Sequence, residues 1–176
     1  MIEAIRPHGL DMMRLKRLYR EAFPREERKP FSVIRRLERE GRSDILAFFD
    51  NGKFIGLAIT VRRDERVLID YLAVHRKMRG KGFGSSILRE LINKYTPNSI
   101  FLEIERITDD APNREERVRR KKFYENLGFS SMNVFIELFG VEMELLGYNT
   151  AITYDEYLSF YVENIGEFAR DHIKEI

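Results

Sequence analysis

The residues best suited to chemistry form a short, basic and glycine-rich segment. Gly80, Gly82 and Gly84 alternate through it, between an apolar run that ends near Val74 and a stretch with helical periodicity. Four basic residues lie beside these glycines: Arg76, Lys77, Arg79 and Lys81. Glycine lets the backbone bring its N–H groups against a ligand without a Cβ in the way, and the first turn of a helix adds unpaired N–H groups with a partial positive charge. The pattern predicts a cradle for a diphosphate.

Two other phosphate-binding motifs fit the segment less well. The P-loop string G-x-x-x-x-G-K-[ST] does not occur in the sequence. A dinucleotide-binding turn would need its third glycine where Ser85 stands, and it would follow its strand tightly, whereas Gly80 comes six residues after Val74. Glu103, 23 residues beyond Gly80, is the one feature that favours a dinucleotide. The balance favours another ligand with a diphosphate.

Acidic residues on two predicted strands are candidates for proton transfer. Glu103 and Glu105 interrupt an otherwise apolar run, and the two-residue period of a strand places both on the same face. Asp70 lies on the adjacent predicted strand. A carboxylate in such a place can remove a proton from a substrate amine, directly or through a water molecule.

Length and composition exclude several classes of protein. With 176 residues the chain forms one domain, with room for a small appended lobe. The absence of cysteine excludes disulfides, thiolate zinc sites and a cysteine nucleophile, and no two of the three histidines have the spacing of a helical metal site, so we predict no metal. The net charge of +2 predicts neither a nucleic-acid nor a membrane partner. The N-terminus lacks the apolar core of a signal peptide, and no 18-residue apolar run exists, so we predict a cytoplasmic protein.

The elements that position these residues alternate between short β-rich runs and longer helical patterns, which indicates a mixed α and β fold. Strands are predicted at 2–6, 44–49, 53–62, 66–74, 99–105, 129–138 and 141–148, and helices at 10–23, 31–40, after the glycines to 95, and 114–127. Asn51 and Gly52 predict a tight hairpin, so the three strands from 44 to 74 form an antiparallel meander. A last helix opens at Thr153, where Glu156 completes a capping box. Its apolar stripe is Leu158, Tyr161, Val162, Ile165, Phe168 and Ala169.

Two stretches and the order of elements resemble the GCN5-related N-acetyltransferase (GNAT) superfamily. Arg79-Gly-Lys-Gly82-Phe-Gly84 matches the R/Q-x-x-G-x-G/A signature of that superfamily, and Lys121-Lys-Phe-Tyr124-Glu-Asn-Leu-Gly-Phe129 is similar to its second hallmark, a tyrosine late in the helix before a G-F turn. The resemblance covers residues 1–148 and implies a mixed, mainly antiparallel twisted sheet of about seven strands flanked by helices. Residues 149–176 are then an extra C-terminal helix packed on the same domain.

The resemblance also implies an activity: transfer of an acetyl group from acetyl-coenzyme A to a primary amine by direct attack. It implies that the signature loop binds the pyrophosphate. The pantetheine arm then pairs with the edge of the preceding strand, where that strand splays from the strand at 99–105. The cofactor-binding residues are then Leu72, Ala73, Val74, Arg79, Gly80, Lys81, Gly82, Phe83, Gly84 and Ser85. Glu103 is the implied general base, with Asp70, Glu105 or a water molecule as alternatives. Tyr124 is the implied acid that protonates the leaving sulfur.

The chain departs from the family pattern before this tyrosine. Arg117 and Arg120 stand where the family often has an asparagine and a small residue, and the loop after Glu105 is longer. Asn113 is a possible replacement for the usual side-chain contact with the cofactor. The alternative function, in a different class, is a non-catalytic domain that keeps the cradle but senses acetyl-coenzyme A or serves as a scaffold.

The sequence leaves the acceptor open between small molecules and peptides. The superfamily shapes its acceptor site with the connector between the first two helices, here Pro24–Pro30, and with the strand pair after Gly128. Glu26 and Glu27 in this connector could attract a cationic amine. Both a monomer and a homodimer are compatible with the sequence.

Overall fold

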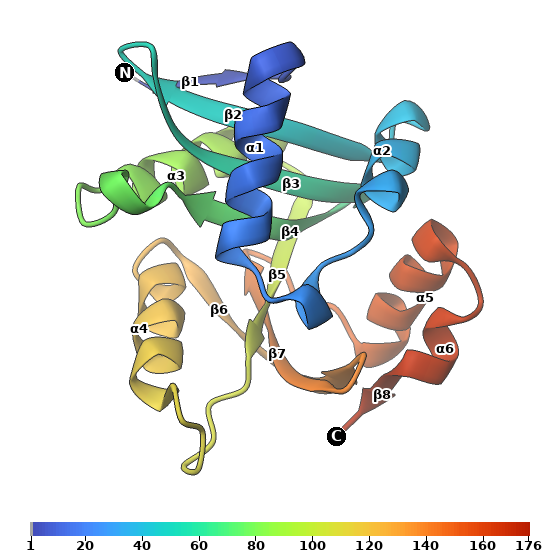
Figure 1. Ribbon diagram of the computed structural model, residues 1–176. Coiled ribbons are helices and arrows are strands. Elements are labelled where there is room, and N and C mark those ends of the chain that lie inside the picture. Colours follow the sequence, from blue (N-terminus) through green and yellow to red (C-terminus); the bar gives the residue numbers. More distant parts are fainter. Residues whose placement is uncertain (1) are drawn as a thin grey trace. The chain divides into compact units, whose positions relative to one another are not determined.

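The strands and helices expected from the sequence form in the computed structural model, which describes residues 2–176 (Figure 1). The chain divides into two units, one made of residues up to Arg62 with Ile69–Lys94, and the other of Arg63–Leu68 with Tyr95–Ile176. Unit 1 contains β1 (Ile2–Ile5), α1 (Gly9–Ala22), α2 (Phe31–Arg39), β2 (Ser43–Asp50), most of β4 (Arg66–Val74), and all but the last residue of β3 (Lys53–Arg63) and of α3 (Phe83–Tyr95). Unit 2 contains β5 (Ser99–Glu105), α4 (Arg114–Glu125), β6 (Phe129–Leu138), β7 (Val141–Tyr148), α5 (Tyr154–Ile165), α6 (Ala169–His172) and β8 (Ile173–Glu175).

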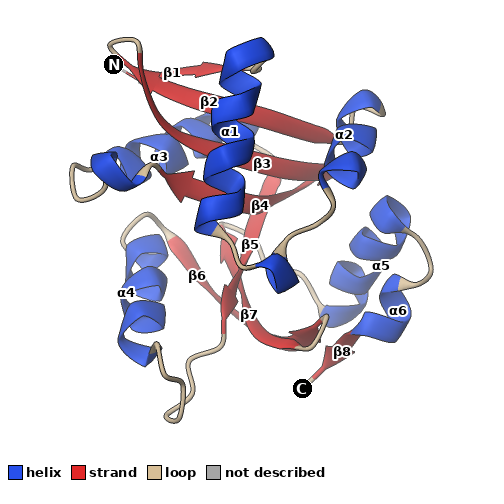
Figure 2. Ribbon diagram, viewed as in Figure 1, coloured by secondary structure: helices blue, strands red, loops and turns tan. Residues whose placement is uncertain are grey.

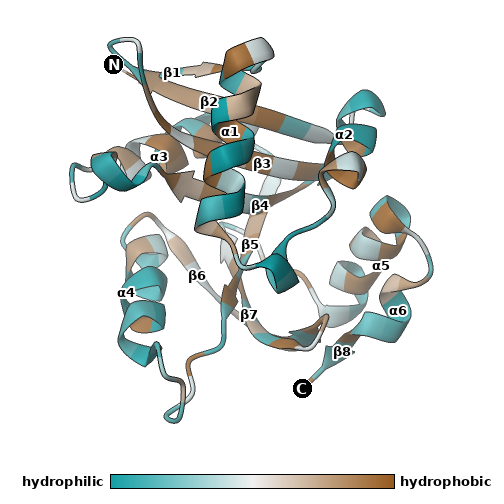
Figure 3. Cartoon of the chain, viewed as in Figure 1, coloured by the Kyte–Doolittle hydropathy of each residue, from teal (hydrophilic) through white to brown (hydrophobic). Residues whose placement is uncertain are grey.

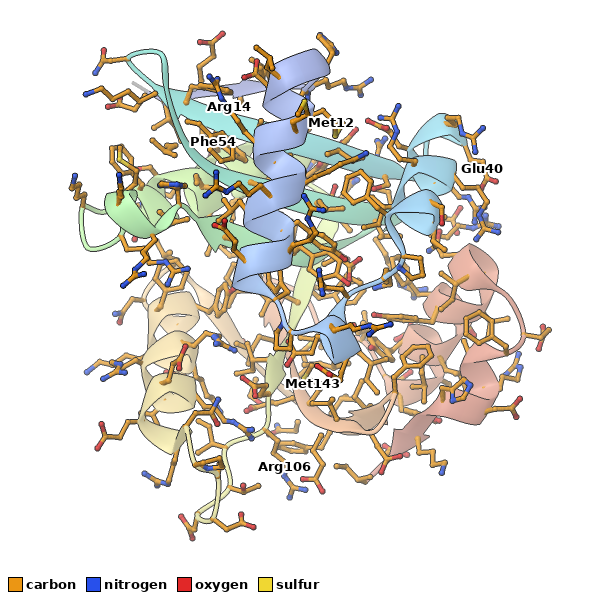
Figure 4. The ribbon with its side chains drawn as sticks, in the orientation of Figure 1. Met12, Arg14, Glu40, Phe54, Arg106 and Met143 are labelled. Carbon is orange, nitrogen blue, oxygen red and sulfur yellow. The ribbon has the colours of Figure 1, made fainter. Side chains whose placement is uncertain are left out.

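Unit 1 is an antiparallel sheet with helices on both faces. Its strand order is β1-β2-β3-β4, and Figure 1 shows α1 crossing in front of these strands while α3 passes behind them. Buried side chains of α1, α2 and the strands form one cluster: Leu15, Leu18, Tyr19, Ile34, Ile45, Ala47, Phe49, Leu57, Ile59, Tyr71 and Ala73. Met12 and Phe54, labelled in Figure 4, are partly buried against it. The alternation of the strands thus gives α1 and α2 a continuous apolar face.

Two glycines in β3 and in the turn before it have identifiable roles. Asn51 and Gly52 have φ values of 47° and 73°, as the predicted tight hairpin requires. At Gly56, an added Cβ would lie 2.5 Å from the carbonyl oxygen of Ala73 and 2.9 Å from Cδ1 of Ile87. The missing side chain therefore lets β3 approach the end of β4 and lets α3 pack closely on this face.

Unit 2 begins with the first residues of β4. Arg66–Leu68 pair in parallel with Ser99–Phe101 of β5, and the order continues β5-β7-β6-β8 with antiparallel pairs. Figure 2 shows α4 on one side of β5–β7, and α5 with α6 on the other. The hydropathy colours of Figure 3 mark α4 as a largely hydrophilic helix, in keeping with its charged sequence.

The C-terminal region differs from the sequence prediction. The capping box at Thr153 and Glu156 is present, but α5 ends at Ile165, and Gly166 follows with a φ of 107°. Of the predicted stripe, Tyr161 and Ala169 are buried, whereas Phe168 is 50% exposed. The buried face of α5 also contains Tyr157, Phe160 and Asn164, which the stripe did not include. A short α6 and an eighth strand, β8, follow. The backbone freedom of Gly166 ends the helix where periodicity alone predicted its continuation.

The fold class expected from the sequence is confirmed: a mixed, mainly antiparallel sheet with flanking helices and an additional C-terminal helix. The described residues contain eight strands rather than about seven. Within residues 2–176, no helix has the length and apolar character needed to cross a membrane.

Candidate functional site

The glycine-rich loop lies in unit 1, between β4 and α3. A single 3-10 turn, Arg76–Met78, leads into it, and the Arg79 Nε donates a hydrogen bond of 3.1 Å to the carbonyl oxygen of Val74. Gly80 and Gly82 have φ values of 73° and 80°, and no atom lies within 4 Å of the position where their Cβ would be. Backbone conformation, rather than lack of space, therefore requires glycine at both positions. The arginine of the signature closes the loop onto the end of its own strand.

The loop presents a run of backbone donors. In the described chain, the first N–H group after Arg79 that donates to a backbone carbonyl is that of Ser86, which bonds to Gly82 at 3.1 Å. The N–H groups of residues 80–85 thus lie at the start of α3 without a backbone acceptor, where the helix contributes partial positive charge. Four cations on the loop are exposed: Arg76, Lys77, Arg79 and Lys81. This arrangement can bind a diphosphate through backbone N–H groups and charge.

The three residues predicted to meet the pantetheine arm form the end of β4. Ala73 is buried in the core cluster of unit 1, whereas Leu72 and Val74 are half-buried. The N–H group of His75, the next residue, donates to the carbonyl oxygen of Ile55 at 2.8 Å. This strand end is therefore fixed to β3 directly before the chain turns into the glycine-rich loop.

Asp70, an alternative base, belongs to a network that anchors the connector between α1 and α2. Lys29 Nζ lies 2.6 Å from Asp70 Oδ1, and the carboxylate is 3% exposed. The backbone N–H of Lys29 donates to the Tyr71 hydroxyl at 2.9 Å, and this hydroxyl donates to the carbonyl oxygen of Glu27. The Tyr19 hydroxyl donates to the carbonyl oxygen of Lys29 at 3.0 Å. The connector is therefore bonded to β4 at two successive residues.

Burial dominates the electrostatics of this network. It raises the pKa of Tyr19 to about 12 and raises the pKa of Tyr71 above its ordinary value, with the nearby Asp70 charge acting in the same direction. Both hydroxyls therefore stay protonated at neutral pH and remain hydrogen-bond donors. Asp70 Oδ1 is committed to Lys29, while its Oδ2 is buried without a hydrogen-bond partner.

Glu103 lies in unit 2, on β5. The hydroxyls of Tyr157 and Tyr161, both from α5, donate to its Oε1 at 2.6 and 2.7 Å. Tyr157 is fully buried, and its ring packs edge-on against Phe101. The C-terminal helix, which lies outside the family resemblance, thus holds the carboxylate predicted as general base.

Glu105 bonds to a different helix. Its two oxygens accept from Arg117 at 3.0 Å and from Arg120 at 2.8 Å, both on α4. Arg117 also bonds to Oδ1 of Asn113 and to the carbonyl oxygen of Arg106. The two arginines that depart from the family pattern therefore attach α4 to the end of β5, and Asn113 is engaged in the same contact.

Tyr124 lies on the last turn of α4. Its ring packs edge-on against Phe123 and Phe129. Burial raises the pKa of its hydroxyl to about 12, although the charge of Arg120 acts to lower it. Lys121 does not act on this hydroxyl but binds both oxygens of Glu144, at 2.8 and 2.9 Å. Tyr124 is therefore protonated across the physiological pH range.

The structure distributes the predicted residues between the two units. Unit 1 contains Asp70, residues 72–74 and the whole glycine-rich loop, and unit 2 contains Glu103, Glu105 and Tyr124. Within residues 2–176, no group of three or more histidine, cysteine, aspartate or glutamate side chains could hold a metal ion.

Sequence reasoning missed the groups that hold the acids. Lys29 lies 41 residues before its partner Asp70, and Tyr157 lies 54 residues after Glu103. The spacing of Tyr157 and Tyr161 by one helical turn was the available signal, because two hydroxyls on one helix face need polar partners when buried.

Comparison with known proteins is consistent with this geometry. The model of the acetyltransferase (GNAT) family matches residues 12–129. The Bacillus subtilis (strain 168) protein YjbC, whose name assigns it to the acetyltransferases, is 35% identical over 109 residues, which are 62% of this chain. The match spans 53% of YjbC, about half of its length.

Solved structures share the fold. A GNAT-family protein from Bacteroides thetaiotaomicron superposes with a TM-score of 0.75 at 22% identity, over 93% of this chain and 97% of that one. A Bacillus subtilis acetyltransferase in complex with CoA has a TM-score of 0.63 at 16% identity, over 85% and 97% of the two chains. At these identities the likeness establishes the fold alone.

The bonds from α5 to Glu103 predict a stability effect. Replacing Tyr157 by Phe should lower the free energy of unfolding by about 1.5–3 kcal/mol, because a carboxylate loses a donor while the ring stays in place. Tyr154→Phe is the matched control, since its hydroxyl donates only to the neutral carbonyl of Ile173, and it should cost about 0.5–1.5 kcal/mol. Urea denaturation measures both. Equal losses in the two variants would show that Glu103 gains nothing from Tyr157.

The raised pKa of Tyr124 predicts a specific alkaline titration. An ordinary tyrosine ionises near pH 10, so the folded chain should hold this proton until about pH 12. The contribution of this group to stability is complete below about pH 10 and is lost as the pH rises towards 12, because the unfolded chain releases the proton first. Absorbance titration near 295 nm should show that Tyr124→Phe has one tyrosine fewer ionising near pH 12 than the wild type. If the variant lost an ordinary transition near pH 10, the inferred burial of the hydroxyl would be wrong.

Proposed function

The chain belongs to the acetyltransferase (GNAT) family, and from this premise we propose that it transfers an acetyl group from acetyl-coenzyme A to a primary amine. The observation that carries the proposal is the run of N–H groups at residues 80–85, at the N-terminus of α3, with exposed cations beside it. Such donors suit the pyrophosphate of coenzyme A. Arg79 and Lys81 add charge, and Leu72, Ala73 and Val74 offer the strand edge for the amide-bearing arm.

The acceptor amine needs a base. An amine with a pKa of ~10.4 is about 0.1% neutral at pH 7.4, which costs roughly 4 kcal/mol. We assign the base to Glu103, directly or through a water molecule, because the hydroxyls of Tyr157 and Tyr161 donate to its Oε1 and orient its carboxylate. Asp70 is the weaker candidate, since its Oδ1 is paired with Lys29. Glu105 is weaker as well, since both of its oxygens face arginines.

Tyr124 is assigned to the leaving sulfur. The amine nitrogen attacks the thioester carbonyl, the carbon–sulfur bond breaks, and a thiolate leaves. Complete proton transfer from a phenol with a pKa of about 12 to a thiolate whose thiol has a pKa of ~8.5 is unfavourable by about 5 kcal/mol. Tyr124 therefore acts first as a hydrogen-bond donor to the sulfur as negative charge develops there, and its high pKa keeps this donor protonated.

The remaining features stay predictions from the sequence: a small-molecule or peptide amine as acceptor, a cytoplasmic location, no nucleic-acid partner, and a monomer or homodimer. The unit 1 connector and the strands after Gly128 are the segments that would distinguish one acceptor from another.

Calorimetric titration with acetyl-coenzyme A tests the cradle. We expect saturable binding, and a ligand concentration of ~100 times Kd should add about 2.7 kcal/mol to the free energy of unfolding. NADPH is the matched control, since it also contains a diphosphate and an adenine nucleotide, and it should not bind. Gly82→Ala should weaken binding, because its φ of 80° is unfavourable for alanine. The acetyltransferase proposal fails if acetyl-coenzyme A produces neither heat nor a shift in melting temperature.

Turnover distinguishes an enzyme from an acetyl-coenzyme A sensor. Tyr124→Phe should retain cofactor binding but lose ~10²-fold or more in kcat, because it removes the donor to the leaving sulfur. Tyr154→Phe removes a hydroxyl outside the proposed machinery and should keep wild-type kcat. Unchanged kcat in Tyr124→Phe would exclude the assigned role. Binding with no turnover of any amine would favour the non-catalytic alternative.

A further inference from the structure

A pocket of about 370 Å³ lies beside the connector between α1 and α2, within unit 1. Its lining comes from the C-terminal half of α1, from the connector and from the first residue of α2. Five of the lining residues are basic: Lys16, Arg20, Arg25, Arg28 and Lys29. No acidic residue lines it. A concave surface lined by one sign of charge attracts ligands of the opposite sign.

The basic side chains of the pocket differ in whether they already have an interaction partner. Lys29 is paired with Asp70, and Lys16 lies over the ring of Phe31, 4.7 Å from its centroid. Among the described residues, Arg20, Arg25 and Arg28 form no ion pair with an acidic side chain. The Nε of Arg28 is also buried without a hydrogen-bond partner. A buried guanidinium donor without an acceptor is costly, and a bound anion would satisfy it.

We propose that this pocket binds a ligand that carries a phosphate or carboxylate group beside a small apolar or aromatic part. The anionic group meets Arg25 and Arg28, because guanidinium groups bind such anions through charge-assisted, bidentate hydrogen bonds. The apolar part meets Tyr19, Pro30 and Phe31 on the same lining. The combination of aromatic rings, with Tyr19 and Phe31 packed edge to face, and cations suits an aryl phosphate better than a bare inorganic ion.

The pocket is separate from the glycine-rich cradle, since no residue between 76 and 85 lines it. It is nevertheless fixed to the same strand. Lys29 pairs with Asp70, and its N–H donates to the Tyr71 hydroxyl, directly before Leu72. The bound anion therefore has two possible sources. It is either the anionic end of the acceptor amine or a separate effector. The first alternative rests on the proposed function.

Calorimetry with phenyl phosphate tests the site on the whole chain. Coenzyme A is kept in excess so that the cradle is occupied, and phenol is the matched ligand without the anion. We expect saturable binding of phenyl phosphate only. Arg28→Gln and Arg25→Gln should each weaken it about tenfold or more, because each removes a charge-assisted bond. Arg17→Gln, on α1 but outside the lining, is the matched loss of charge and should leave affinity unchanged.

Three outcomes would overturn the proposal. Phenyl phosphate does not bind in a saturable manner, phenol binds equally well, or Arg17→Gln weakens binding as much as Arg28→Gln. The melting temperature of each variant is measured first, so that loss of binding is not confused with loss of the fold. Two arginine variants are used so that the site stays testable if one of them unfolds.

A second arm identifies the source of the anion. Acetylation of 2-aminoethyl phosphate is compared with that of ethanolamine. If the pocket binds the acceptor, the phosphate-bearing amine should have the higher kcat/KM, and Arg28→Gln should remove most of this difference. If the two amines react equally while phenyl phosphate still binds, the ligand is a separate effector. If neither amine is acetylated, the proposed function loses support. The calorimetric titration with phenyl phosphate still tests the pocket, because it does not depend on turnover.

Discussion

The need to pair carboxylates on the strands constrains much of this structure. A carboxylate that leaves water loses several kcal/mol unless it is paired and hydrogen-bonded. Five acids on strands are largely removed from solvent: Asp44, Asp70, Glu103, Glu105 and Glu144. Almost all of their partners come from elsewhere in the chain, from helices, the connector and another strand. Each pair therefore fixes an element as well as satisfying a charge, and removing one partner would leave a costly unpaired group.

This constraint explains how a hydrophilic helix holds a defined place. The α4 helix has no fully buried residue, so apolar packing contributes little to its position. Lys121 binds both oxygens of Glu144, and Arg117 and Arg120 bind Glu105, so ion pairs along one face orient the helix. This attachment of the helix also places Tyr124, whose ring packs edge-on against two phenylalanines. The arginines that depart from the family pattern are thus part of the framework that positions the tyrosine.

The two proposed anion sites of unit 1 would bind their ligands in different ways. The glycine-rich loop offers backbone N–H groups in a fixed geometry, which suits a diphosphate of constant shape. The pocket at the connector offers basic side chains beside aromatic rings, with Lys16 over the ring of Phe31, which suits an anion that carries an aromatic part. The sequence suggested that Glu26 and Glu27 of the connector attract a cationic amine. Neither residue lines the pocket, whose charged lining residues are all basic. A polycationic acceptor is therefore a poor fit to this surface.

The sequence by itself determined the order and bounds of nearly every element, the hairpin at Asn51-Gly52, the capping box at Thr153, and the glycine-rich loop. These depend on local periodicity, turn chemistry and helix caps, which act within a few residues. Only the tertiary structure decided the partners of the acids, the pKa of Tyr124 and the basic pocket. Lys29 meets Asp70 across 41 positions and Tyr157 meets Glu103 across 54. Such pairs follow from desolvation in the folded chain, which no local pattern records.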